Sequence, residues 1–205
     1  MTVPSTASPS HATTSTTEAT TNPVPTPTDG TIGTRDPQAQ ADLDRRLRDA
    51  AWADDVAAAR DLIARGADVN AKDETQQSAY LVTTSEGYLD LLNLTLAHGG
   101  DVASKDSFNG TGLIRAGERG HTGVVGRLIR AGVEVNHVNR LGWTALHEAI
   151  ILGKGTRQWQ EIVKILVGAG ADPNLADADG VSPLRHAESR GYDEIAKTLR
   201  AAGAR

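Results

Sequence analysis

Apolar residues follow the spacing of short amphipathic helices over most of the chain. In the segment TALHEAIIL they fall at Leu146, Ala149, Ile150 and Leu152, and residues three and four apart share one face of a helix. Other segments carry adjacent apolar pairs of the kind that a buried helix face uses: Leu62 with Ile63, Leu128 with Ile129, and Ile165 with Leu166. The pattern predicts an all-helical domain built from short helices.

These segments recur with a period of 33 residues. Three sets of markers keep the same phase, and each set lengthens one step from 33 to 38 residues. The sets are Gly66, Gly99, Gly132, Gly170 and Gly203; Ser78, Thr111, Thr144 and Ser182; and Gly87, Gly120, Gly153 and Gly191. No single unit of this size can bury its apolar face alone, so neighbouring units must stack.

The five extra residues lie after Gly153 and before Ile162, in the stretch KGTRQWQE. Its Gly-Lys-Gly-Thr resembles a phosphate-binding loop only superficially, because that loop needs G-x-x-x-x-G-K-[ST] after a buried strand. We interpret the stretch as an insertion between two helices. Trp159 and Arg157 within it form either a local lid on the fourth repeat or a second binding site.

The repeated phrases are similar to ankyrin repeats. The strongest matches are NRLGWTALHEAIILG with IVKILVGAGADPN, and DADGVSPLRHAESRGYDEIAKTLRAAGA. The resemblance covers about residues 41–205 and implies an all-α solenoid of about five stacked helix-turn-helix repeats with short β-hairpin tips. The expected repeats are 38–70, 71–103, 104–136, 137–174 and 175–205. The chain also resembles small bacterial ankyrin-repeat proteins, many of which are made with export signals.

Local signals indicate where the helices begin and end. Thr144 and Ser182 stand where a hydroxyl caps a helix, and Pro183 suits a first helical turn. The series Gly87, Gly120, Gly153 and Gly191 is expected to end the first helix of each repeat. The second and third repeats read SAYL and TGLI in place of the family's T-P-L-H, so their helices should begin less rigidly.

Residues 1–37 have a different composition, rich in Thr, Ser and Pro, with six of the chain's eight prolines. Such a segment buries too little apolar surface to offset its ordering entropy, so we predict a disordered tail. It is either dispensable or a spacer to an anchor. The first residues show no secretory signal, which indicates a cytoplasmic protein as written, or a periplasmic one if an upstream signal was removed.

Composition excludes several functions. The formal net charge of -5 argues against nucleic acid as a partner, and the lack of cysteine excludes disulfides and thiolate metal sites. No apolar run is long enough to span a membrane. His147-Glu148 lacks the second histidine of H-E-x-x-H, since residue 151 is Ile. We therefore expect no enzymatic activity, no catalytic or metal-binding residues and no cofactor.

The remaining candidate is a protein-binding surface. In ankyrin-repeat proteins the hairpin tips and first helices form a concave face, which the resemblance maps onto Glu74, Thr75, Gln77, Ser107, Phe108, Glu118, Arg119, Arg140, Leu141, Trp143, Asp179 and Val181. Aromatic residues and arginine dominate interface hot spots, so Phe108, Arg140, Leu141 and Trp143 stand out. We predict a monomeric interaction module for an unidentified protein. The alternative is an accessory factor that stabilises an exported enzyme in the bacterial envelope.

Overall fold

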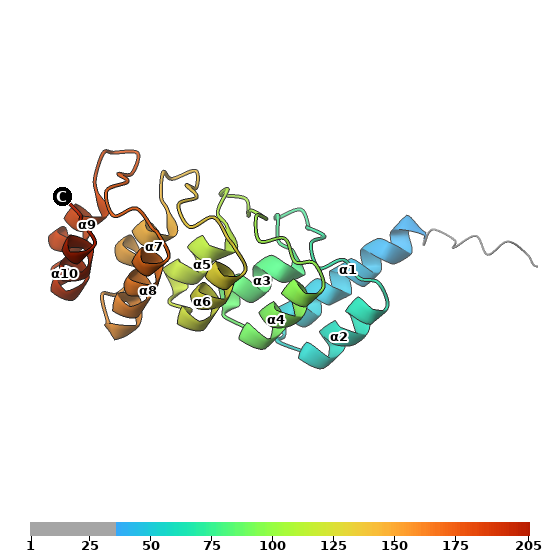
Figure 1. Ribbon diagram of the computed structural model, residues 1–205. Helices are drawn as coiled ribbons and strands as arrows, with labels where there is room; N and C mark the ends of the chain where they lie inside the picture. The colour runs from blue at the N-terminus through green and yellow to red at the C-terminus, as the bar shows by residue number, and fades with distance from the viewer. Residues whose placement is uncertain (1–35) are drawn as a thin grey trace, which may run out of the picture. The chain divides into compact units, whose positions relative to one another are not determined.

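The computed structural model describes residues 36–205, and over that range the chain forms ten helices stacked as five antiparallel pairs (Figure 1). The helices are α1 (Pro37–Trp52), α2 (Val56–Ala64), α3 (Ala79–Glu86), α4 (Leu89–Ala97), α5 (Gly112–Arg119), α6 (Thr122–Arg130), α7 (Ala145–Ile151), α8 (Arg157–Gly168), α9 (Pro183–Ser189) and α10 (Asp193–Ala201). The odd-numbered helices pack against one another in one layer, and the even-numbered helices form a second layer. The predicted all-helical solenoid is confirmed.

The N-terminal boundary differs slightly from the prediction. The predicted tail, residues 1–37, lies almost wholly outside the described residues. Pro37, however, is the first residue of α1, one position before the expected start of the domain. Proline suits this place because the first turn of a helix leaves its backbone N–H groups without helical partners. None of the helices within residues 36–205 is long and apolar enough to cross a membrane.

Hydroxyl caps begin three of the first-layer helices. Ser78 accepts a hydrogen bond from the Leu81 N–H, and Ser182 accepts one from the Arg185 N–H. Thr144 forms a capping box with His147, whose Nδ1 in turn accepts the Thr144 N–H at 3.2 Å. The caps at Thr144 and Ser182 were predicted from the sequence.

Glycine ends the first-layer helices in only part of the predicted series. Gly87 and Gly120 are left-handed C-caps with φ of 84° and 85°, as predicted. Gly153 is not, because α7 ends in a right-handed Leu152. Gly153 serves close packing instead: a Cβ there would lie 1.9 Å from the Ala149 carbonyl oxygen. The insertion that follows turns the chain differently, which the repeat pattern could not show.

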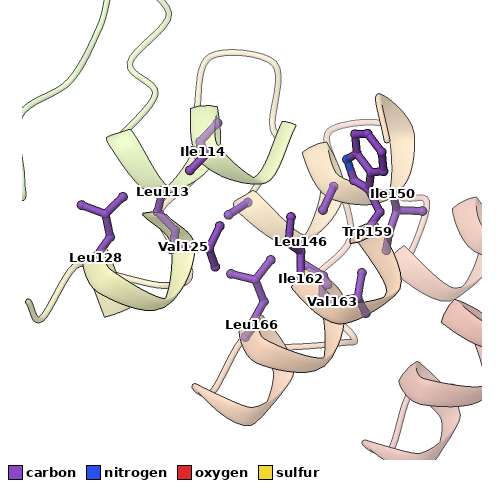
Figure 2. Packing of buried hydrophobic residues seen from close by; sticks show 14 of the residues in the cluster. Leu113, Ile114, Val125, Leu128, Leu146, Ile150, Trp159, Ile162, Val163 and Leu166 are labelled. Atoms are coloured by element: carbon purple, nitrogen blue, oxygen red, sulfur yellow. The ribbon is translucent and has the colours of Figure 1, made fainter. Parts of the chain in front are cut away.

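In the third repeat, which lacks the proline and histidine of the family pattern, two glycines allow close helix packing. A Cβ on Gly112 would lie 2.7 Å from the Thr84 side chain, and one on Gly117 would lie 3.1 Å from the Ala145 carbonyl oxygen. Small residues therefore let α5 approach both α3 and α7. Leu113, Ile114 and the other apolar residues of α5 to α8 fill the core between the layers, as Figure 2 shows.

The insertion in the fourth repeat and Gly153, which precedes it, form hydrogen bonds with the third and fifth repeats. Trp159 is only 7% exposed and belongs to the core (Figure 2). Its Nε1 donates to the Glu118 carbonyl of the third repeat at 3.3 Å, while the Tyr192 hydroxyl of the fifth donates to the Gly153 carbonyl at 3.1 Å. The structure thus favours the lid over a second binding site at Trp159.

Candidate protein-binding face

Each hairpin tip is organised by one Asp or Asn side chain. Its Oδ1 accepts the backbone N–H groups two and four residues further along the chain, at 2.8–3.1 Å. The four residues are Asp73, Asp106, Asn139 and Asp177. The N–H of each of these four residues also donates to the carbonyl four residues further along, at 2.9–3.0 Å, and within residues 36–205 the one isolated β-bridge joins Lys105 to Thr111. The tips are therefore side-chain-stabilised turns that hold their shape without strands.

The residue nine positions later, on the following helix, completes three of these turns. Arg115 Nε donates to Asp106 Oδ2 at 2.5 Å, and His186 Nε2 contacts Asp177 Oδ2 at 2.6 Å. In the fourth repeat the roles of donor and acceptor reverse, because Asn139 Nδ2 donates to Glu148 Oε1 at 2.8 Å. Each tip is thereby tied to the helix below it.

The tips of the third and fourth repeats lie side by side. The Arg140 N–H donates to the Phe108 carbonyl at 2.9 Å, and Arg140 Nη1 donates to the Ser107 carbonyl at 2.6 Å. Phe108 is 51% exposed and Leu141 is 48% exposed. Trp143 is only half-buried at the base of its tip. Four of the predicted residues, Ser107, Phe108, Arg140 and Leu141, are thus brought together.

The predicted residues on α5 are held in ion pairs. Glu118 contacts Arg115 Nη1 at 2.9 Å, and Arg119 Nη1 contacts Glu86 on α3 at 2.7 Å. The Arg115 guanidinium also lies 5.4 Å from the centre of the Phe108 ring. These contacts link the helix layer to the third tip.

The remaining predicted residues occupy the outer repeats. Glu74 and Thr75 are exposed at the second tip, where Thr75 Oγ1 donates to Asp73. Asp179 and Val181 belong to the last tip, where their N–H groups donate to Asp177. They share the same kind of turn with Phe108 and Leu141.

Sequence reasoning missed Trp52, the last residue of α1. Trp52 is 48% exposed and borders a pocket of about 190 Å³. The pocket is lined by Trp52, Gln77, Leu81, Ser85, Asp106, Arg115 and Arg119. A signal was present: Leu43, Leu47, Ala50 and Ala51 already form the buried stripe of α1, which leaves the neighbouring tryptophan off that stripe.

We call the surface formed by the hairpin tips and the first-layer helices the tip face. Its exposed apolar side chains are Trp52, Phe108 and Leu141, and its accessible cationic side chains include Arg119 and Arg140. Apolar side chains next to arginine are the composition that protein interfaces favour at their centre.

Beneath the tip face lie two buried titratable neighbours with opposite pKa shifts. Burial, together with the Glu118 charge, raises the pKa of Glu148 to about 7, against the opposing effects of Asn139 and Arg115. Burial lowers the pKa of His147 to about 4, and the neighbouring His186 acts in the same direction. Glu148 Oε2 and His147 Nε2 are buried without a hydrogen bond of normal geometry. Neither residue reaches the surface to act on a substrate.

The described part of the chain also contains no group of three His, Asp or Glu residues placed to hold a metal ion. On the tip face, Arg115, Glu118 and Arg119 are paired with other charged side chains, and Arg140 Nη1 donates to a backbone carbonyl.

Comparison with known proteins establishes the family. The family model for ankyrin repeats matches residues 77–177 and 113–205. The chain is 41% identical over 144 residues to the putative ankyrin repeat protein YahD of Escherichia coli K12, covering 70% of this chain and 72% of that protein. The chain therefore belongs to the ankyrin-repeat family.

Two further similar proteins match different shares of this chain. The crystal structure of an ankyrin repeat domain from Acinetobacter baumannii AYE is 57% identical, with a TM-score of 0.76, over 78% of this chain and 81% of that one. Protein phosphatase 1 regulatory subunit 27 of Mus musculus is 43% identical over 81 residues, which are 39% of this chain and 49% of that protein. Ankyrin repeats are a general protein–protein interaction fold, and a fold alone names no partner.

Proposed function

We propose that the chain is a non-enzymatic module that binds a protein partner through the tip face. The observation that carries this proposal is the exposure of Phe108 and Leu141 on two adjoining tips, while the apolar side chains of α5 and α7 are buried. Such exposure contributes nothing to folding, and neighbouring exposed apolar groups are typical of interaction sites.

The tip face is organised before a partner arrives. The Oδ1 atoms of Asp106 and Asn139 each fix two backbone N–H groups of their tips, so Phe108 and Leu141 stand on ordered turns. A preorganised surface loses less conformational freedom on binding, which favours affinity. The pocket beside Trp52, about 190 Å³ in volume, has room for roughly one large apolar side chain of the partner.

The direct test is affinity capture from the native host with a tip-face variant and a control variant. Trp52→Ala with Phe108→Ala removes two exposed aromatics of the tip face. Leu89→Ala removes a side chain of the second-layer helix α4 that is 40% exposed. The tip-face variant should lose the captured protein, with a Kd at least roughly 30-fold weaker, as expected for loss of a hot spot worth about 2 kcal/mol.

The control variant should bind like the wild type, and both variants should keep the wild-type far-UV circular dichroism spectrum. Retention of the partner by the tip-face variant would refute the proposal. Capture from separated cytoplasmic and envelope fractions also tests the alternative role as an accessory of an exported enzyme, because that role requires a single envelope client.

A further inference from the structure

A compact cluster of charged groups lies directly under the third tip. Arg115 of α5 contacts Asp106 of the tip at 2.5 Å and Glu118 of α5 at 2.9 Å. Glu148 of α7 adds a third carboxyl group on the other side, 2% exposed, with Oε1 bonded to Asn139. The Arg115 guanidinium therefore pairs with two carboxylates and interacts electrostatically with the third carboxyl group.

Two atoms of this cluster are uncommitted. Glu148 Oε2 is buried without a hydrogen bond. Arg115 uses Nε for Asp106 and Nη1 for Glu118, which leaves Nη2 outside its hydrogen bonds with the described residues. While Glu148 carries a proton, the cluster holds one positive and two negative charges.

Ionisation of Glu148 changes this balance. A third buried negative charge requires a hydrogen-bonded cation, because an unpaired buried carboxylate is strongly unfavourable. The charged groups that face Glu148 are Arg115 and Glu118 of α5 and Asp106 of the third tip, and Arg115 is the only cation among them. On the other side of α7, His186 and Asp177 face the neutral His147 rather than Glu148.

We propose that Glu148 is a proton-controlled switch that moves Arg115 and thereby loosens the Phe108 tip when Glu148 loses its proton. Arg115 reaches Glu148 by turning its uncommitted Nη2 toward α7, which shifts the guanidinium from its position 5.4 Å from the Phe108 ring and weakens its contacts with Asp106 and Glu118. The functional meaning of this switch rests on the proposed function, because the Phe108 tip is part of the proposed binding surface.

The consequence is a binding surface whose order depends on pH. Below neutrality Arg115 braces both the Asp106 turn and the Phe108 ring, so the tip is rigid. Above neutrality Arg115 is drawn toward α7, and Phe108 loses its cationic support. The pKa of Glu148, about 7, places this change close to neutral pH.

The test is a pH titration by NMR between pH 5 and 9, and it needs no partner. The probes are the Glu148 side-chain carboxyl carbon, the Arg115 Nε–H group and the Phe108 backbone amide. We expect all three to shift with one common midpoint, and Glu148→Gln to abolish the shift of Arg115. Glu161→Gln on α8 is the matched control, because Glu161 is exposed, and it should leave the titration unchanged.

His137 Nε2 also contacts this tip, at the Asn109 carbonyl at 2.7 Å, so Arg115 is the deciding probe. An Arg115 signal that stays still in the wild type, or that moves equally in Glu148→Gln, would overturn the proposal. If Glu148→Gln fails to fold, different midpoints for Glu148 and Arg115 in the wild type would overturn it as well. Retention of the partner by the tip-face variant, with this titration as expected, would refute only the proposed function.

Discussion

Glu148 should make the protein less stable as the pH rises toward neutrality, and replacing it with Gln should remove that effect. The pKa of Glu148 rises from an ordinary value of 4.5 to about 7 in the folded chain. A shift of one unit corresponds to about 1.36 kcal/mol, so the full effect is about 3 kcal/mol. Gln retains an amide oxygen for the bond with Asn139 and cannot ionise.

The sign follows from proton linkage. Below pH 4.5 Glu148 is protonated in both the folded and the unfolded chain and contributes nothing. Between pH 4.5 and about 7 only the folded chain holds the proton, so the free energy of unfolding falls as the pH rises. Above pH 7 the penalty is complete.

His147 acts in the opposite direction. Its pKa falls from 6.5 to about 4 on folding, so the unfolded chain binds the proton more readily. Its contribution is fully present above pH 6.5 and is lost as the pH falls toward 4. The two neighbours therefore largely cancel over the range that they share, and Glu148→Gln should expose the dependence due to His147.

The assay is urea unfolding of the wild type and Glu148→Gln at half-unit steps from pH 4 to 8. The difference in unfolding free energy should grow by about 3 kcal/mol in favour of the variant between pH 4.5 and 7, then level off. Glu161→Gln should show no such growth, since Glu161 is exposed. A difference that is independent of pH would refute the reasoning.

Two other matched pairs of substitutions test the packing. Thr111→Val should stabilise the fold by about 1 kcal/mol in thermal unfolding, because the Thr111 hydroxyl is buried without a partner. Thr144→Val should destabilise the fold by about 1–2 kcal/mol, because the Thr144 hydroxyl caps α7. Equal effects of the two substitutions on stability would contradict this reasoning. Gly153→Ala should cost about 2 kcal/mol or more in chemical unfolding, because the new Cβ would lie 2.4 Å from Trp159. Gly168→Ala, with nothing within 4 Å, should be neutral or stabilising, and a larger loss there would contradict the packing.

The structure places the central predicted residues of the tip face on adjoining tips and adds Trp52 beside them. Phe108, Arg140 and Leu141 could be located from the sequence because the repeat phase assigns each to a tip. Their exposure and mutual contact agree with that assignment. Trp52 was missed because the first repeat lacks the T-P-L-H marker, so no phase assigned a side chain of α1 to the tip face. Whether these residues bind a partner stays a prediction.

The sequence by itself determined the solenoid. A 33-residue period, an apolar stripe of helical spacing and the caps at Thr144 and Ser182 are local features, and stacking is the one way such units can bury their apolar faces. Because each repeat contacts mainly its neighbours, the sequence of single repeats was enough to predict the helices, the tips and the order in which the repeats stack. It also located the insertion to within a few residues.

Only the tertiary structure decided what happens between repeats. The burial of Trp159 and the cluster around Glu148 depend on residues about 30 to 40 positions apart along the chain. The packing role of Gly153 depends on where the insertion places Trp159. Burial and charge balance are sums over all neighbours in space, so no repeat-by-repeat reading supplies them. Glu148 illustrates the reason. In the sequence it is one acidic residue of a helix, and only its buried environment raises its pKa so that it holds its proton near neutral pH.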